Sequence, residues 1–175
     1  MKITFAAAVA ALALFAVPAF AQSPSDAQIA SIVVTANQVD IDAGNLVESK
    51  GSNADIKAFG KQMVTDHTGV NKQAVALVTR LKVMPEDNPT SQSLKKGGED
   101  NVRNLRTLSG AAFDRAYIEH EVAYHQAVID ALDKTLIPSA QNAELKALLV
   151  KTRPAFVAHL DHAKQVQSDL AKGSG

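Results

Sequence analysis

Apolar residues recur every three to four positions along most of this 175-residue chain, and no stretch alternates apolar and polar residues as a half-buried strand would. A spacing near 3.6 residues places apolar side chains on one side of a helix, which must then pack against other helices. Four long segments carry this pattern, separated by polar or proline-containing turns. The sequence therefore predicts an all-α protein, a four-helix bundle.

Local signals place the ends of the first two helices. The first is expected to begin near Ser25, which has capping-box spacing to the glutamine three residues later, and to end at Gly51. The second is expected to begin after Ser52 or Asn53 and to run to about Val83, where MPEDNPT stops it with two prolines.

The second half of the chain is expected to contain a crossover and two further helices. Residues 91–110 are interpreted as a weak or broken helix, because Gly97-Gly98 interrupts them. The third long helix is expected from Ser109-Gly110 to about Leu136, and the last from about Ala140 to Ala171, with a kink at Pro154. A long crossover between the second and third helices predicts ferritin-like connectivity.

The first 21 residues are interpreted as a cleaved signal peptide. An early lysine, a long apolar run and the Ala19-Phe20-Ala21 ending predict cleavage before Gln22, which leaves one domain over residues 22–175. An uncleaved membrane helix is the competing interpretation, and Pro18 argues against it. We expect a periplasmic or secreted protein with no membrane span in the mature chain. The sequence does not determine the oligomeric state and leaves open that the protein forms a homodimer.

Composition excludes several classes of function. The chain has 18 basic and 18 acidic residues, a balance that gives no electrostatic case for nucleic acid or an anionic membrane surface. It has no cysteine, and therefore no disulfide, thiol nucleophile or thiolate metal ligand. No serine neighbours the candidate histidines in sequence and no phosphate-binding glycine loop occurs, so no catalytic residue or organic cofactor is predicted.

Each predicted helix places a polar side chain on its apolar side. These residues are Asp40, His67, the pair Glu121 and His125, and His159. Burying a carboxylate without a partner costs several kcal/mol, so these groups are expected to meet one another or a cation. Imidazole and carboxylate ligands from facing helices suit one transition-metal ion such as zinc, iron or copper. The alternative is a metal-free hydrogen-bond network that fixes the register of the helices.

Heights along the bundle refine this expectation. Asp40 and His67 lie at heights that differ by about 4–5 Å, so contact between them is predicted. His125 and His159 are expected to be offset by roughly 10 Å, and Glu121 to fit His159 better. Asp66 is expected to point away from its neighbour and pair on the surface.

Three stretches, FGKQMVTDHT, LSGAAFDRAYIEHEVAYHQAV and RPAFVAHLDHAKQ, resemble a bacterial exported family known as domain of unknown function 4142. The resemblance covers roughly residues 26–170 and implies a ferritin-like fold without implying an activity. The family pattern carries over to Asp66-His67, Phe113, Asp114, Tyr117, His125 and His159, while Asp40 replaces the usual glutamate of the first helix. His120 and His162 lie outside this pattern.

Ferritin-like di-iron proteins place Glu-x-x-His on two helices. Val64 and Phe156 occupy the corresponding positions before His67 and His159, so at most a mononuclear, histidine-rich site is expected. The function predicted from the sequence is binding of a single transition metal by an exported helical bundle. The sequence favours a binding protein over an enzyme and leaves an enzymatic activity open. The alternative is a non-enzymatic envelope or stress-related protein that acts through partner contacts.

Overall fold

The structure is a computed structural model that describes residues 23–173, and within that range it is all-helical. The predicted all-α class is confirmed. The predicted signal peptide, residues 1–21, lies outside the described residues. The elements are α1 (Asp26–Lys50), α2 (Ala54–Leu81), α3 (Pro89–Thr107), α4 (Gly110–Ala131), the π-helical turn η1 (Leu132–Leu136), α5 (Ile137–Ser139) and α6 (Ala143–Gly173).

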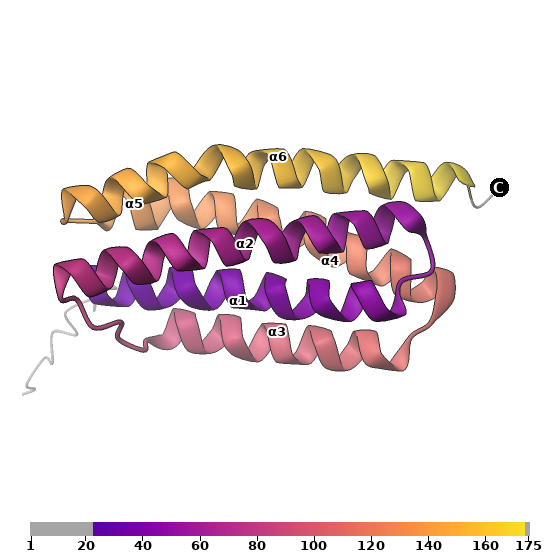
Figure 1. Cartoon of the computed structure of the whole chain (residues 1–175), viewed down its shortest axis with the longest axis horizontal. Coiled ribbons are helices and arrows are strands. Elements are labelled where there is room, and N and C mark those ends of the chain that lie inside the picture. Colours follow the sequence, from indigo (N-terminus) through magenta and orange to yellow (C-terminus); the bar gives the residue numbers. More distant parts are fainter. Residues whose placement is uncertain (1–22, 174–175) are drawn as a thin grey trace, which may run out of the picture.

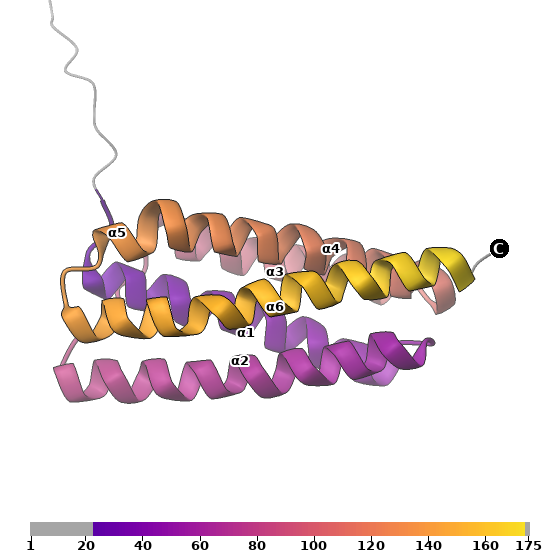
Figure 2. The ribbon, with the colours of Figure 1, turned by 90° about the horizontal axis from the view of Figure 1, so that it is seen from above.

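The helices lie side by side along one common axis (Figure 1). α1 and α2 form an antiparallel pair, and α3 then runs back along α1 so that α4 begins at the end of the bundle where α2 began. α4 and α6 form the second antiparallel pair, and α6 also packs against α2 (Figures 1 and 2). This order is compatible with the predicted ferritin-like connectivity, with α3 as the crossover.

Side-chain caps fix the start of the first two helices. Ser25 and Gln28 form the predicted capping box at α1. Asn53 caps α2 by accepting hydrogen bonds from the backbone N–H groups of Asp55 and Ile56. Because such caps satisfy backbone donors that have no partner inside the helix, they set the boundary locally. The two helices therefore begin where the sequence predicted.

The prediction of a weak or broken crossover helix is wrong, because α3 is one continuous helix. It begins with a capping box at Asn88 and a proline at its first position, a strong local start. Gly98 is buried against α1, where a Cβ atom would lie 2.6 Å from Cγ2 of Val39. The glycine that reads as a helix breaker is therefore the residue that lets α3 approach α1 closely.

The helix after residue 109 continues further than expected, through the π-helical turn and α5 to Ser139. α6 begins at Ala143 instead of Ala140, with Asn142 accepting hydrogen bonds from the backbone of Glu144 and Leu145. α6 continues through Pro154 without a break in its helical assignment. The kink expected at this proline stays a prediction.

The core consists of two apolar clusters, one toward each end of the bundle. Ile29, Leu77 and Leu149 belong to one cluster, and Phe59 and Phe113 to the other. In α1, α2 and α4, the residues Asp40, His67, Glu121 and His125 lie in sequence between members of the two clusters. In α6, His159 is followed by Leu160 of the first cluster and then by Ala163 of the second. The bundle therefore holds a polar layer between two apolar halves.

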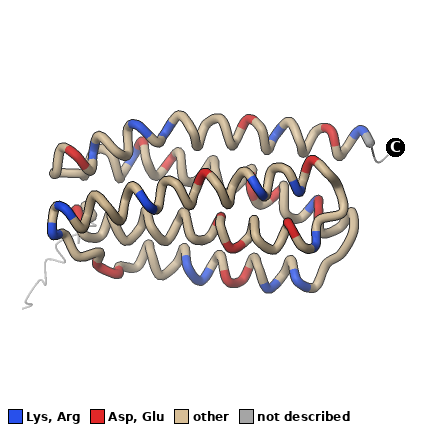
Figure 3. The backbone as a smooth tube through the Cα atoms, in the orientation of Figure 1, with Lys and Arg blue, Asp and Glu red and all other residues tan. Residues whose placement is uncertain are grey.

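The bundle surface carries charges of both signs. Lysine and arginine alternate with aspartate and glutamate along the helices, and the view in Figure 3 shows no face of one sign. Between residues 23 and 173, no helix combines the length and the apolar character that a membrane span requires.

Candidate metal centre

The polar layer draws one or two side chains from each of the four long helices that form the core. α1 supplies Asp40, α2 supplies His67, α4 supplies Glu121 and His125, and α6 supplies His159. All five are buried, with His159 the most exposed at 4%. The structure therefore brings together every residue that the sequence proposed for the site.

Three imidazole rings form a triangle in this layer. The ring centroids of His67 and His125 are 5.7 Å apart, those of His67 and His159 5.2 Å, and those of His125 and His159 5.4 Å. One nitrogen from each ring lies within 4.8 Å of the others. Three neutral imidazole nitrogens at this separation form a group that could hold a metal ion.

The other nitrogen of each ring has a fixed oxygen partner. Nδ1 of His67 is 2.7 Å from Oδ1 of Asn37, whose own Nδ2 donates to the Val33 carbonyl at 2.7 Å. That second bond orients the Asn37 amide, so the His67 Nδ1–H must be the donor. Nδ1 of His125 donates to the Glu121 backbone carbonyl at 3.0 Å, and Nε2 of His159 to Oδ2 of Asp66 at 2.9 Å.

This arrangement leaves a lone pair on Nε2 of His67, Nε2 of His125 and Nδ1 of His159. All three nitrogens are buried without a hydrogen-bond partner. Metal-binding histidines commonly donate their second N–H to a carbonyl or carboxylate, which fixes the tautomer and the ring orientation. The cluster has that pattern on each of its three rings.

A pair of carboxyl groups adjoins the imidazoles. Oδ2 of Asp40 lies 3.2 Å from Nε2 of His67 and 4.0 Å from Nε2 of His125. Oε2 of Glu121 lies 3.4 Å from Nδ1 of His125, and Asp40, Glu121 and His125 form a second group that could hold an ion. The contact predicted between Asp40 and His67 is present.

Burial sets the protonation of the whole layer. It lowers the pKa of His125 to about 4, and lowers the pKa values of His67 and His159 below their usual range, so all three rings are neutral near pH 7. Burial also raises the pKa of Glu121 to about 8, and burial together with the Glu121 charge raises that of Asp40 well above its usual range. Without a cation, the carboxyl pair therefore retains a proton near neutral pH.

The polar atoms of this layer lack protein partners to an unusual degree. Both side-chain oxygens of Asp40 and both of Glu121 are buried without a hydrogen-bond donor, as is the Tyr117 hydroxyl. Nδ1 of His120, which is 3.8 Å from Oε1 of Glu121, is likewise unpartnered. Unsatisfied buried polar atoms are rare in native proteins and call for an ion or a water as partner.

The predicted height offset between His125 and His159 is wrong, and so is the preference for a Glu121–His159 pair. His125 lies 14 residues before the end of the helical run at Ser139, and His159 lies 16 residues after Ala143. At about 1.5 Å per residue the two heights differ by only about 3 Å. The error came from helix ends that were misplaced by three residues on each side of the turn.

Asp66 differs in part from its expected role. Its side chain is 42% exposed, as a surface residue would be, but it accepts a hydrogen bond from the buried His159. Nε2 of Gln62 donates to the same carboxylate at 3.3 Å, and Oε1 of Gln62 accepts from Nδ1 of the exposed His162 at 3.0 Å. Asp66 therefore links the buried cluster to the surface, while His162 stays outside the cluster.

The sequence did not predict that Asn37 would accept a hydrogen bond from His67, or that Asp114 would bind the turn between α1 and α2. Asn37 follows Val33 by four residues, so it lies on the same side of α1, and this spacing was the available signal. The Asp114 carboxylate accepts hydrogen bonds from the backbone N–H groups of Ser52 and Asn53 at 3.0 and 2.9 Å, and from the Ser52 hydroxyl. It holds the α1–α2 turn and takes no part in the histidine cluster.

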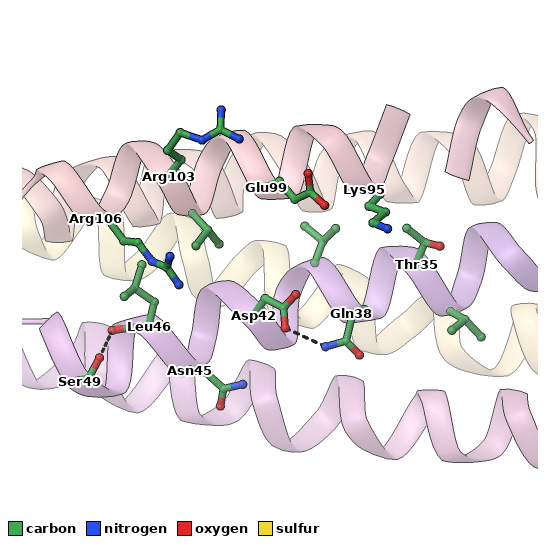
Figure 4. Close-up of a pocket in the computed structure, with 14 residues that line it drawn as sticks. Thr35, Gln38, Asp42, Asn45, Leu46, Ser49, Lys95, Glu99, Arg103 and Arg106 are labelled. Carbon is green, nitrogen blue, oxygen red and sulfur yellow. Dashed lines mark hydrogen bonds between the residues drawn. The ribbon is translucent and has the colours of Figure 1, made fainter. Parts of the chain in front are cut away.

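A groove of about 900 Å³ lies between α1 and α3, away from the histidines (Figure 4). Its charged lining residues have both signs: Asp42, Lys95, Glu99, Arg103 and Arg106. Two of the hydrogen bonds along it, Gln38 to Asp42 and Ser49 to the Leu46 carbonyl, lie within α1. The groove has neither the burial nor the convergent lone pairs of the polar layer.

Comparison with curated proteins and with solved structures gave no match. The family described as "Domain of unknown function (DUF4142)" matches residues 13–166, which include every residue of the polar layer. The resemblance drawn from the sequence is thereby confirmed, and the chain belongs to the DUF4142 family.

Proposed function

We propose that the protein binds a single transition-metal ion in the polar layer between the two apolar halves of its bundle. The observation that carries this proposal is the orientation of the three imidazoles. Each ring has one nitrogen bonded to an oxygen of the protein and a second, buried nitrogen without a hydrogen-bond partner, and the three rings offer nitrogens that lie within 4.8 Å of one another. A network built only to fix register would be expected to pair all three of these buried nitrogens with hydrogen-bond donors.

His67, His125 and His159 would hold the ion, with Asp40 as the fourth ligand, because its Oδ2 lies 3.2 Å from Nε2 of His67 and 4.0 Å from Nε2 of His125. Three imidazoles and one carboxylate suit zinc, copper or iron. Asn37, the Glu121 carbonyl and Asp66 would keep the rings in the tautomers that binding needs. The bound ion would supply Lewis acidity or, for copper and iron, electron transfer; the roles we assign are metal storage, buffering or oxidant defence.

The proposal also includes the location of the protein, which we place outside the cytoplasm. The amino-terminal sequence supports a cleaved leader and a periplasmic or secreted protein, which would meet metal ions outside the cytoplasm. Amino-terminal sequencing of the protein recovered from the periplasm or the medium tests this part, and a chain that still begins at Met1 there contradicts it.

The metal site is tested by titration with cobalt(II), whose visible absorption reports the ligands and the geometry. The wild-type protein is expected to bind one equivalent with the strong visible bands of a four-coordinate site, and His67→Ala to lose them. The matched control is His162→Ala, since His162 is an exposed histidine outside the cluster. Absorption that is absent from the wild type, or equally reduced by both substitutions, would refute the proposal.

The competing interpretation is a metal-free buried network in a protein that acts through partner contacts. The two interpretations differ in their response to chelator. A metal that binds only the folded state adds to its stability, so chelator should lower the melting temperature of the metal-loaded protein and added metal should restore it. A network without metal predicts no change in either direction.

A further inference from the structure

A second site lies next to the histidine cluster, in the half of the bundle that holds the π-helical turn. It is a pocket of about 130 Å³ lined by side chains of all the long helices, and no residue of its lining is charged. Leu132 and Leu136 of η1 form part of its wall. π-helical turns are rare and frequently mark functional sites, so this wall is a second observation that singles out the pocket.

The polar side chains of the lining already have hydrogen-bond partners within the protein. The Tyr124 hydroxyl donates to the Ala36 carbonyl at 2.9 Å, and the Thr152 hydroxyl lies 3.0 Å from the Leu148 carbonyl. The Asn37 amide is engaged with Val33 and with a cluster histidine. The pocket therefore offers apolar surface with no free donor or acceptor for water.

Small residues of α4 form part of the pocket lining. Ala127 is exposed and Ala131 is partly exposed, and a spacing of four residues places both on the same side of the helix. A larger side chain at either position would take up space in the pocket.

We infer that this pocket binds one small, uncharged, apolar molecule no larger than a single aromatic ring. An apolar cavity of about 150 Å³ lined by leucine, isoleucine and phenylalanine stays dry and binds benzene or xenon, and the pocket of 130 Å³ matches it in size and lining chemistry. Phe156 and Asn37 form its boundary with the polar layer, since each also contacts His67. The occupant would lie one side chain away from the histidine cluster. This inference does not depend on the proposed metal site.

The test uses benzene and xenon as apolar probes and pyrimidine as a polar probe of similar shape. Benzene is expected to bind saturably and to raise the melting temperature, xenon to show a protein-dependent shift in its NMR signal, and pyrimidine to do neither. Ala131→Phe, which fills the pocket, should weaken benzene binding at least tenfold. Ala127→Phe adds a ring at the more exposed of the two lining positions and serves as a second filling variant whose fold is less at risk.

The matched control is Ala123→Phe, the same substitution at an exposed position of α4 outside the pocket lining. It should bind benzene as the wild type does. Circular dichroism checks that all variants retain their helix content. The inference is overturned if wild-type protein takes up no benzene saturably, or if both filling variants bind it as tightly as the control.

Discussion

The contact between α3 and α1 predicts opposite effects for the same substitution at two adjacent glycines. At Gly98 a Cβ atom would lie 2.6 Å from Cγ2 and 3.0 Å from Cγ1 of Val39, whereas at Gly97 nothing lies within 4 Å. Val39 is buried and β-branched, so its side chain has little freedom to move aside. Alanine at Gly98 should therefore overpack the interface, and alanine at Gly97 should only improve helix propensity.

The magnitudes follow from these two effects. Replacing a mid-helix glycine by alanine stabilises by roughly 0.5–1 kcal/mol, and overpacking a close interface costs roughly 1–3 kcal/mol. Gly98→Ala should thus destabilise the protein by about 1–2 kcal/mol and Gly97→Ala should stabilise it by about 0.5–1 kcal/mol. For a chain of this size, each kcal/mol corresponds to a melting-temperature change of about 2–4 °C.

Urea unfolding followed by circular dichroism measures both variants against the wild type. The diagnostic result is the difference between them, about 2 kcal/mol, because helix propensity cancels in the comparison. If both variants are stabilised equally, then α3 does not pack on α1 through Gly98, and the account of the crossover helix is refuted.

Three further predictions concern the polar residues. Asp114→Ala should lower the free energy of unfolding by roughly 3 kcal/mol, because it leaves two backbone N–H groups in front of α2 without their charged acceptor; unchanged urea unfolding would contradict this. In the metal-free protein, the pKa of Glu121 is raised to about 8 in the folded state, whereas a glutamate in the unfolded state has a pKa of 4.5. Between these two values the folded state holds a proton that the unfolded state has released. The free energy of unfolding should therefore fall by about 1 kcal/mol per pH unit as pH rises from 6.5 to 8, and by less in Glu121→Gln. The pKa of His125, lowered to about 4, has the opposite effect on the pH dependence, because the unfolded state binds a proton there that the folded state does not. It lowers the free energy of unfolding as pH falls from 6.5 to 4. Urea unfolding across pH with chelator present checks both slopes, and equal slopes above pH 6.5 in the two proteins would be evidence against the buried carboxyl. Asp66→Asn should weaken metal binding about 10–100-fold by loosening His159, measured by competition with a fluorescent chelator, while unfolding changes little because Asp66 is 42% exposed.

The sequence predicted the parts of the fold that local chemistry determines. Capping at Ser25 and Asn53 depends on residues within one turn, so these helix starts could be inferred directly. The inward direction of His67 and its counterparts follows from helix periodicity alone. The class of the fold and the members of the polar layer were therefore accessible without a structure.

What the sequence could not provide depends on contacts between helices. Gly98 reads locally as a helix breaker, and only the approach of Val39 reveals why the glycine is required there. The pairing of His159 with Asp66, and of His67 with Asn37, depends on how the helices are rotated about their axes, which periodicity does not specify. The prediction of the relative heights of His125 and His159 was wrong for a related reason. These heights depend on the length of the irregular turn between α4 and α6, which periodicity does not specify.

The most direct test of the metal site is equilibrium dialysis of untagged protein against zinc, copper and iron, followed by elemental analysis. It should be run on the wild type and on His67→Ala, with His162→Ala as the control for loss of a histidine outside the cluster. The account predicts about one retained metal ion per chain in the wild type and the control, and none in His67→Ala. Wild-type protein that retains no more of any of the three metals than His67→Ala would contradict it.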